Sequence, residues 1–235
     1  MKRKLIHLVS SSIRIQAQGN RWAAGLLALV LLGAGSSFAN TLTVTNRNDS
    51  GAGSLRDAIA TANAGDTIEF SVTGTIPLTS AELALDKNLT IKGPGAAQLA
   101  ISGNGQFRIL FIPSGTIAIS GLTIENGASP GNGNAILNAG TLTLSNCAVS
   151  DSGSVFFTGN SGGGIANSGT LKLVHSTVSH NSVDHLGGGI YNTSGTVMVV
   201  NSTVSDNFLG ERGRRRRRHL QRFRHSRGGQ QHNRG

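Results

Sequence analysis

The chain has 235 residues, 4% of them aromatic, with one cysteine and a formal net charge of +10. A single cysteine allows no intrachain disulfide, so the fold must be held by packing. The positive charge belongs to the two ends, because five Lys or Arg residues precede residue 40 and ten follow residue 210. Residues 40–210 hold six basic and ten acidic residues, and a mildly acidic body argues against nucleic acid as its partner.

Residues 1–39 have the pattern of a signal peptide. A basic region precedes the apolar run 23–32, and Ser37 and Ala39 supply the small residues of a cleavage site before Asn40. The run is too short to span a bilayer comfortably, and no other apolar run comes close to it. We therefore expect an exported protein, extracellular or at a bacterial cell surface or outer membrane, with no transmembrane segment in the mature chain.

Residues 40–80 predict an N-terminal cap. A strand is expected over 41–45 and a helix over 54–64, because Ser54 and Asp57 have the spacing of a capping box. The helix carries an apolar stripe of Leu55, Ala58, Ile59 and Ala62. Gly65 should end it, and strands should begin at Ile68, Phe70 and Val72. Such a helix would lay its apolar face over the open first coil of a solenoid.

Residues 81–210 contain a repeat. Copies begin at Gly133, Gly162 and Gly187, with a weaker copy at Ser114, so that matching positions recur every 25 to 29 residues. Apolar residues alternate within each copy in strands of three to five residues, which Gly, Asn and Ser interrupt. Stacked at one coil per repeat, these strands predict an all-β fold, a right-handed parallel β-helix with one N-terminal capping helix. The frame of leucine-rich repeats is absent.

Asparagine recurs at two points of the repeat. Asn138, Asn167 and Asn192 form one set, and Asn146 and Asn201, with His175 between them, form the other. Amides stacked at the strand spacing can hydrogen-bond to the coils above and below, so we expect asparagine ladders. The alternative is a polar binding stripe on the surface.

Two segments carry family resemblances. The stretch TVTNRNDSGAGSLRDAIATANAGDTIEF, residues 43–70, resembles the CSLREA-type domain of secreted bacterial right-handed β-helix proteins, with Gly53 in place of the motif's cysteine. The later coils resemble the repeats of chlamydial polymorphic outer-membrane proteins, whose FxxN and GGxI elements are echoed by residues 157–160 and 163–165. The resemblance implies a secreted or cell-surface protein, often adhesive or anchored by a C-terminal module.

Enzymes also use this fold, and their catalysis depends on polar residues of the coils. Coils 114–210 hold one lysine, Lys172, no arginine, and four carboxylates at turn edges: Glu125, Asp151, Asp184 and Asp206. Asp151 and His180 are the neighbours best placed to pair, whereas inverting glycosidases need two carboxylates about 6.5–9.5 Å apart. We predict solvated turn residues and no catalytic residue in this part of the chain.

Other chemistries have less support. His175, His180 and His185 would converge on a metal only if their loop folded back. Cys147 is expected to be a half-buried small apolar residue and not a catalytic thiol. The glycine-rich runs precede strands, whereas a phosphate-binding loop would open a helix. The sequence thus predicts no metal, no nucleotide and no other cofactor.

Residues 211–235 form a basic tail with the composition of a disordered segment. Its codons also admit a second reading one base later, in which Arg214–Arg218 become glycines and residues 219–221 become Ile-Tyr-Asn. Residues 223–226 then give Ser-Gly-Thr-Val and residues 230–232 Asn-Ser-Thr, which repeats residues 187–203 at an offset of 29. We interpret the tail as a frameshift product, and its arginines as no sign of nucleic-acid binding.

Two functions follow from this sequence. The first is the N-terminal part of a non-catalytic secreted or cell-surface β-helix protein, with glycans or other surface proteins as partners and a role in adhesion or surface structure. The second is a truncated polysaccharide lyase or glycoside hydrolase of the pectate-lyase-like fold, whose catalytic coils would lie beyond the frame break.

Overall fold

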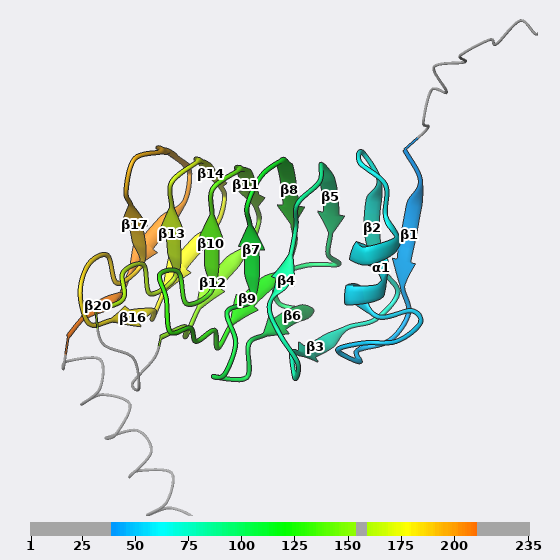
Figure 1. The fold of residues 1–235 in the computed structure, drawn as a ribbon, viewed down its shortest axis with the longest axis horizontal. Helices are drawn as coiled ribbons and strands as arrows, with labels where there is room; N and C mark the ends of the chain where they lie inside the picture. The colour runs from blue at the N-terminus through cyan, green and yellow to red at the C-terminus, as the bar shows by residue number, and fades with distance from the viewer. Residues whose placement is uncertain (1–38, 154–158, 211–235) are drawn as a thin grey trace, which may run out of the picture. The chain divides into compact units, whose positions relative to one another are not determined.

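The computed structural model describes residues 39–153 and 159–210. Its strands are short and pair in parallel with the strand one coil away, which forms a right-handed parallel β-helix (Figure 1). The predicted fold class is confirmed. The predicted signal peptide, up to residue 38, and the predicted basic tail, 211–235, lie outside the described residues.

Three parallel sheets make up the walls of the solenoid. Sheet A contains β1 (Thr41–Val44), β2 (Thr67–Phe70), β5 (Leu89–Lys92), β8 (Thr116–Ser120), β11 (Thr141–Ser145), β14 (Thr170–Val174) and β18 (Thr196–Val200). Sheet B contains β3 (Gly74–Pro77), β6 (Leu99–Ser102), β9 (Thr123–Glu125), β12 (Ala148–Ser150), β15 (Thr177–Ser179) and β19 (Thr203–Ser205). Sheet C contains β4 (Leu83–Ala84), β7 (Leu110–Ile112), β10 (Ile136–Asn138), β13 (Ile165–Asn167) and β17 (Ile190–Asn192). A small fourth sheet pairs β16 (Ser182–Val183) with β20 (Phe208–Leu209).

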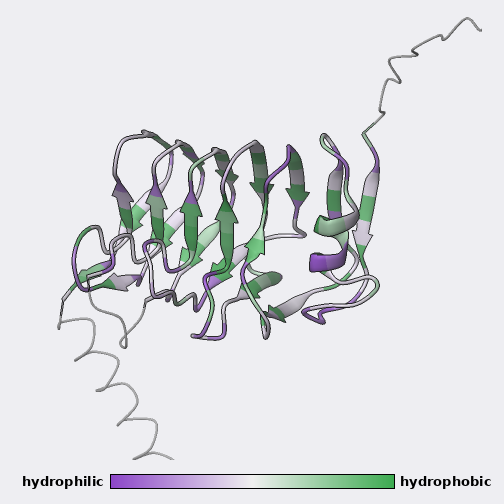
Figure 2. Ribbon diagram, in the orientation of Figure 1, coloured by the Kyte–Doolittle hydropathy of each residue, from purple (hydrophilic) through white to green (hydrophobic). Residues whose placement is uncertain are grey.

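The register of the sheets stacks like residues in columns. Ile117, Leu142, Leu171 and Val197 share one column of sheet A, and Ile124, Val149, Val178 and Val204 share one column of sheet B. Every second residue of a strand points inward, as period-two alternation requires. Apolar residues therefore recur in successive coils (Figure 2) and form one continuous core.

Helix α1 (Leu55–Thr61) lies between β1 and β2 in the chain (Figure 1). In later coils, strands of sheets B and C occupy this interval between two successive strands of sheet A. Its stripe of Leu55, Ala58, Ile59 and Ala62 is buried as predicted. The helix is three residues shorter at its C-terminal end than predicted, because Ala62 already has extended backbone angles. The Asp66 carboxylate then fixes the turn by accepting the Asn63 N–H at 2.7 Å.

The N-terminal end of α1 has half of the predicted capping box. Ser54 Oγ accepts the Asp57 N–H at 3.2 Å, as expected. The Asp57 carboxylate, however, accepts the N–H of Gly53 at 3.4 Å, while the Ser54 N–H donates to Gly51 O. Of the three predicted strand starts, Ile68 and Phe70 lie in β2, but Val72 lies outside any strand and only packs against the core.

No helix within residues 39–153 and 159–210 is long and apolar enough to cross a membrane. The strand pairing passes residue 80 without a break, since β2 pairs with β5 and β3 pairs with β6. The coils that precede the recognisable repeats are therefore built in the same way as the repeats themselves.

Candidate functional site

The first asparagine set forms a ladder inside the solenoid. Asn138 Nδ2 donates to Asn167 Oδ1 at 2.6 Å, and Asn167 Nδ2 donates to Asn192 Oδ1 at 2.7 Å. The prediction of a ladder is confirmed. Asn138 and Asn167 are 0% and 1% exposed, so the alternative, a binding stripe on the surface, is wrong for these residues. In the preceding coil the matching residue is Ile112, and Asn138 Oδ1 has no hydrogen-bond partner among the described residues.

The structure contains two further ladders that the sequence analysis did not predict. In one, Ser152 N–H donates to Asn181 Oδ1 and Asn181 N–H donates to Asn207 Oδ1, both at 3.1 Å. In the other, Cys147 N–H donates to Ser176 Oγ at 3.1 Å and Ser176 N–H donates to Ser202 Oγ at 3.0 Å. The recurrence of asparagine at 181 and 207 and of serine at 176 and 202 is the sequence pattern that could have predicted these ladders.

Two columns of left-handed residues mark the ends of the sheet strands. After sheet A, the residues Asn146, His175 and Asn201 have φ of 52°, 47° and 47°. After sheet B, the column is Asn126, Asp151, His180 and Asp206, with φ of 55°, 53°, 57° and 53°. Asn and Asp tolerate this conformation better than most residues. The backbone of the turns thus accounts for the recurring Asn and Asp residues at these positions.

Asp151 and His180, which the sequence predicted as a pair, both belong to this second column. Both residues follow matched strands of sheet B, so they are neighbours in adjacent coils. Asp151 also lies close to a second carboxylate, Glu125, which is one coil earlier, and the two negative charges interact. Burial and, second, the negative charge of Asp151 raise the pKa of Glu125. Sheet B therefore carries a carboxylate pair that sequence spacing did not single out.

The three histidines do not converge. His175 follows β14 and its Nε2 is 3.3 Å from Asn201 Nδ2, while His185 Nδ1 is 3.4 Å from Ser161 Oγ. His180 follows β15 in sheet B. Within residues 39–153 and 159–210, no three His, Cys, Asp or Glu side chains are grouped as metal ligands would be.

Cys147 is a buried free thiol in the core. Burial raises the pKa of this thiol, and its Sγ lies 3.3 Å from Ser145 O and 3.6 Å from Ile119 O. A nucleophilic cysteine needs a lowered pKa and access to solvent. Cys147 is fully buried, whereas the sequence predicted a half-buried small residue.

Within residues 39–153 and 159–210, a candidate for a ligand site is an open groove where the loops between sheets B and C pass from one coil to the next. Its volume is about 630 Å³ and it is lined by Ser80, Ala81, Glu82, Gln106, Phe107, Arg108, Ala128, Ser129, Pro130 and Gly131. These loops precede β4, β7 and β10, so three successive coils build the groove. The sequence did not predict this groove, because Glu82 and Arg108 precede the recognisable repeats that begin at Ser114.

Arg108 is the fixed centre of this groove. Its guanidinium donates to Glu82 Oε2 at 2.6 Å, to Gly133 O at 3.0 Å, to Ser129 Oγ at 2.9 Å and to Asn132 O at 3.1 Å. Four bonds from one planar group hold three loops in register. The Glu82 side chain remains 33% exposed, so its carboxylate can still accept hydrogen bonds from a ligand.

Gln106 and Phe107 complete the lining with an exposed amide and a half-buried ring. An amide and a carboxylate can bind vicinal hydroxyl groups, and an aromatic ring offers an apolar surface beside them. The groove therefore has the chemistry of a site for a neutral, hydroxyl-rich ligand.

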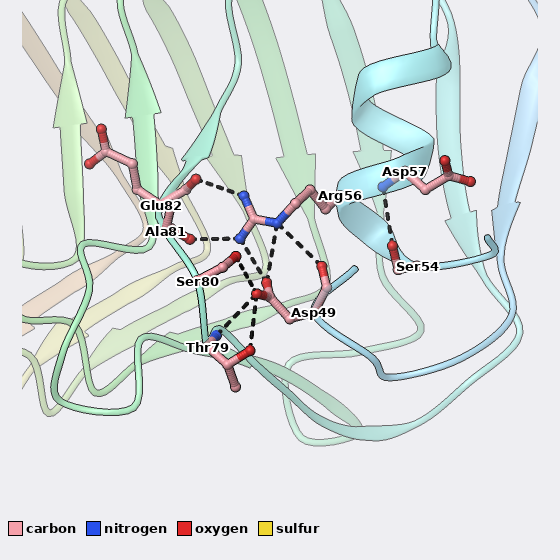
Figure 3. A network of polar contacts seen from close by, with 8 residues as sticks. All are labelled: Asp49, Ser54, Arg56, Asp57, Thr79, Ser80, Ala81 and Glu82. Atoms are coloured by element: carbon pink, nitrogen blue, oxygen red, sulfur yellow. Dashed lines mark hydrogen bonds and ion pairs between the residues drawn. The ribbon is translucent and has the colours of Figure 1, made fainter. Parts of the chain in front are cut away.

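A second polar network joins Asp49, in the loop before α1, and Arg56 to residues 79–82, which precede β4 (Figure 3). Arg56 Nη2 is 2.7 Å from Asp49 Oδ1 and donates to Ala81 O at 2.6 Å, while Nη1 donates to Glu82 O at 2.9 Å. Thr79 and Ser80 donate to the other oxygen of Asp49. Burial acts to raise the pKa of Asp49, but these hydrogen bonds and the charge of Arg56 together lower it.

This network shares Ser80, Ala81 and Glu82 with the groove, whereas Asp49 and Arg56 do not line it. Arg56 binds the two carbonyl groups that immediately precede β4, and Glu82, whose side chain pairs with Arg108, carries one of them. Asp49 is only 9% exposed and all its bonds are internal. We assign Asp49 and Arg56 a structural role.

Comparison with protein-family models and with curated proteins gave no match for this chain. The resemblances to CSLREA-type domains and to polymorphic outer-membrane repeats therefore remain predictions from the sequence.

Proposed function

We propose that the chain is the N-terminal part of a non-catalytic, exported β-helix protein that binds glycans at a cell surface in an adhesive or structural role. The observation that carries the proposal is the groove around Gln106, Phe107 and the Glu82–Arg108 ion pair. A hydroxyl-rich sugar matches its amide, carboxylate and ring, and the regular coils hold it on a rigid support.

The test is glycan binding by the mature chain that begins at Asn40. Gln106→Ala and Phe107→Leu should each weaken binding at least fivefold, since one removes a hydrogen-bonding group and the other the ring. Lys172→Ala is the matched control, because Lys172 is exposed on sheet A, away from the groove residues. Equal binding by all four proteins would contradict a glycan site in the groove.

Export is tested separately. Secreted material should begin at Asn40, because Ser37 and Ala39 define one cleavage site. Recovery of exported protein that keeps Met1 would contradict the signal peptide.

The alternative is a truncated polysaccharide lyase or glycoside hydrolase. The carboxylates of Glu125 and Asp151 favour it, because a raised pKa beside a second acid suits a general acid. Incubation with acidic and neutral polysaccharides distinguishes the two proposals. New reducing ends or unsaturated products that disappear in Glu125→Gln would establish the enzyme. Translation of the downstream DNA in the shifted frame would show whether further carboxylate-rich coils or a surface anchor follow.

A further inference from the structure

A second cavity lies in the first coil of the solenoid, beside the loop that follows β1. Its volume is about 550 Å³, and its lining consists of residues 45–48, Val72, and Thr75 and Pro77 of β3. Among the described residues that line this pocket, Arg47 is the one that carries a charge. The groove, in contrast, contains an ion pair whose two charges offset each other. The pocket is therefore cationic, whereas the groove is neutral.

Arg47 has no protein partner within residues 39–153 and 159–210. The ion pairs of these residues use Arg56, Lys92 and Arg108, and Lys87 donates to two carbonyl groups at the end of α1. A guanidinium presents its N–H donors in a plane that matches a carboxylate with two parallel hydrogen bonds. The exposed Arg47 side chain can offer all of these donors to a ligand.

The loop and strand β3 together place Arg47 at the pocket. The backbone N–H groups of Thr45 and Asn46 both donate to Gly53 O, at 2.9 and 3.3 Å, which fixes the start of the loop. The Arg47 side chain lies against Gly74, where a Cβ atom would be 2.7 Å from Arg47 Nη1. Glycine at this position therefore leaves the space that the guanidinium occupies.

The neutral residues around Arg47 fit the remainder of a sugar. The side chains of Asn48 and Thr75 are exposed and have no hydrogen bond to another described residue, so an amide and a hydroxyl can bind sugar hydroxyl groups. Val72 and Pro77 supply apolar surface beside them. A polyanion such as nucleic acid is bound by several cations, whereas this pocket offers one. The lining thus favours a ligand with one negative charge and several hydroxyl groups.

We propose, resting on the glycan-binding function proposed above, that this pocket binds the carboxylate of an acidic sugar, a uronic acid, and that Arg47 recognises its charge. The glycan that the chain binds is then acidic. The pocket and the groove are joined through one residue: Asn48 lines the pocket, and the next residue, Asp49, accepts a hydrogen bond from Ser80 Oγ at 2.5 Å. Ser80 in turn lines the groove.

The test is an NMR titration of the full-length chain with glucuronate, with glucose as the neutral control. Glucuronate should shift the Arg47 Nε–H signal and bind about tenfold more tightly than glucose, because a charge-assisted pair adds to the hydroxyl contacts. Arg47→Ala should remove this preference. Arg47→Lys should retain part of it, since an ammonium keeps the charge but not the planar pair of donors. Lys172→Ala is the matched control, because it removes the same charge from an exposed side chain on sheet A and should leave the preference unchanged.

Equal affinity for glucuronate and glucose, or a preference that survives Arg47→Ala, would overturn the proposal. Tighter binding of inorganic phosphate or sulfate than of glucuronate at the Arg47 signal would overturn it too, since the sugar hydroxyls would then contribute nothing. The groove has its own readout, the binding of a neutral glycan, which Gln106→Ala should weaken and Arg47→Ala should leave unchanged. A glucuronate effect at Arg47 without any effect of Gln106→Ala would uphold the pocket and contradict the groove, and the converse result would do the opposite.

Discussion

The two ends of the solenoid differ in how far their apolar core is covered. At the N-terminal end, α1 buries Leu55 and Ile59 against the first coils, and Arg56 and Asp49 tie the loop before it to the start of β4. At the C-terminal end, Val199 and Val204 remain about half exposed. A stacked repeat cannot close itself, because each coil is made to receive another. Closure needs a different sequence, and only residues 40–66 supply one among the described residues.

The largest expected effect is at the closed end. Arg56→Ala should cost about 3 kcal/mol of unfolding free energy, because it leaves the buried Asp49 carboxylate without its cation and frees the carbonyls of Ala81 and Glu82. Chemical denaturation of the mature chain measures the loss.

The matched control is the exposed ion pair of Glu69 and Lys92, with an Nζ to Oε1 distance of 3.5 Å. Glu69→Ala should cost well under about 1 kcal/mol, since solvent screens this pair. Similar losses for Arg56→Ala and Glu69→Ala would mean that the Asp49 network does not hold the end closed.

The second effect compares one valine in two coils. Val178→Ala should destabilise the chain by about 2 kcal/mol more than Val204→Ala, because Val178 is fully buried and Val204 is not, although they share a column. Equal losses in thermal or denaturant unfolding would show that the end of the solenoid is covered in solution.

Much of this contrast could be predicted from the sequence. Alternation within Thr141–Ser145 and its copies identifies the strands, and the repeat period identifies the stacking. The capping pair Ser54/Asp57 and the apolar stripe identify the helix. These signals are local or periodic, so one chain suffices to detect them.

The groove could not be predicted in the same way. Glu82, Arg108 and Ser129 lie in loops of different length that have no common spacing, and only the register of β4, β7 and β10 brings them together. Helix length was also overestimated, because the break at Ala62 depends on the Asp66 carboxylate that caps the turn. Single-sequence periodicity contains neither kind of information.

The third effect compares two asparagines of the same ladder, of which Asn167 is buried and Asn192 is exposed. Asn167→Ala should cost about 1 to 2 kcal/mol, because it leaves the amides of Asn138 and Asn192 without their partner in a buried ladder. Asn192→Ala should cost less than half as much, since Asn192 is exposed. A larger loss for Asn192→Ala would contradict an open C-terminal end.

The smallest effect is the response of the closed end to acid. The pKa of Asp49 is lowered in the folded chain, so its ionised form stabilises the fold. That contribution is complete above the ordinary value of about 3.9 and is lost as the pH falls through the lowered pKa. Glu125 has the opposite sign, because its raised pKa favours the protonated fold and costs stability near neutral pH. Asp49→Asn should therefore lower stability at pH 7 and flatten the acid limb of the stability curve, whereas Glu125→Gln should raise stability at pH 7. Parallel stability curves for wild type and Asp49→Asn between pH 7 and about pH 2 would show that the carboxylate does not hold the N-terminal loop.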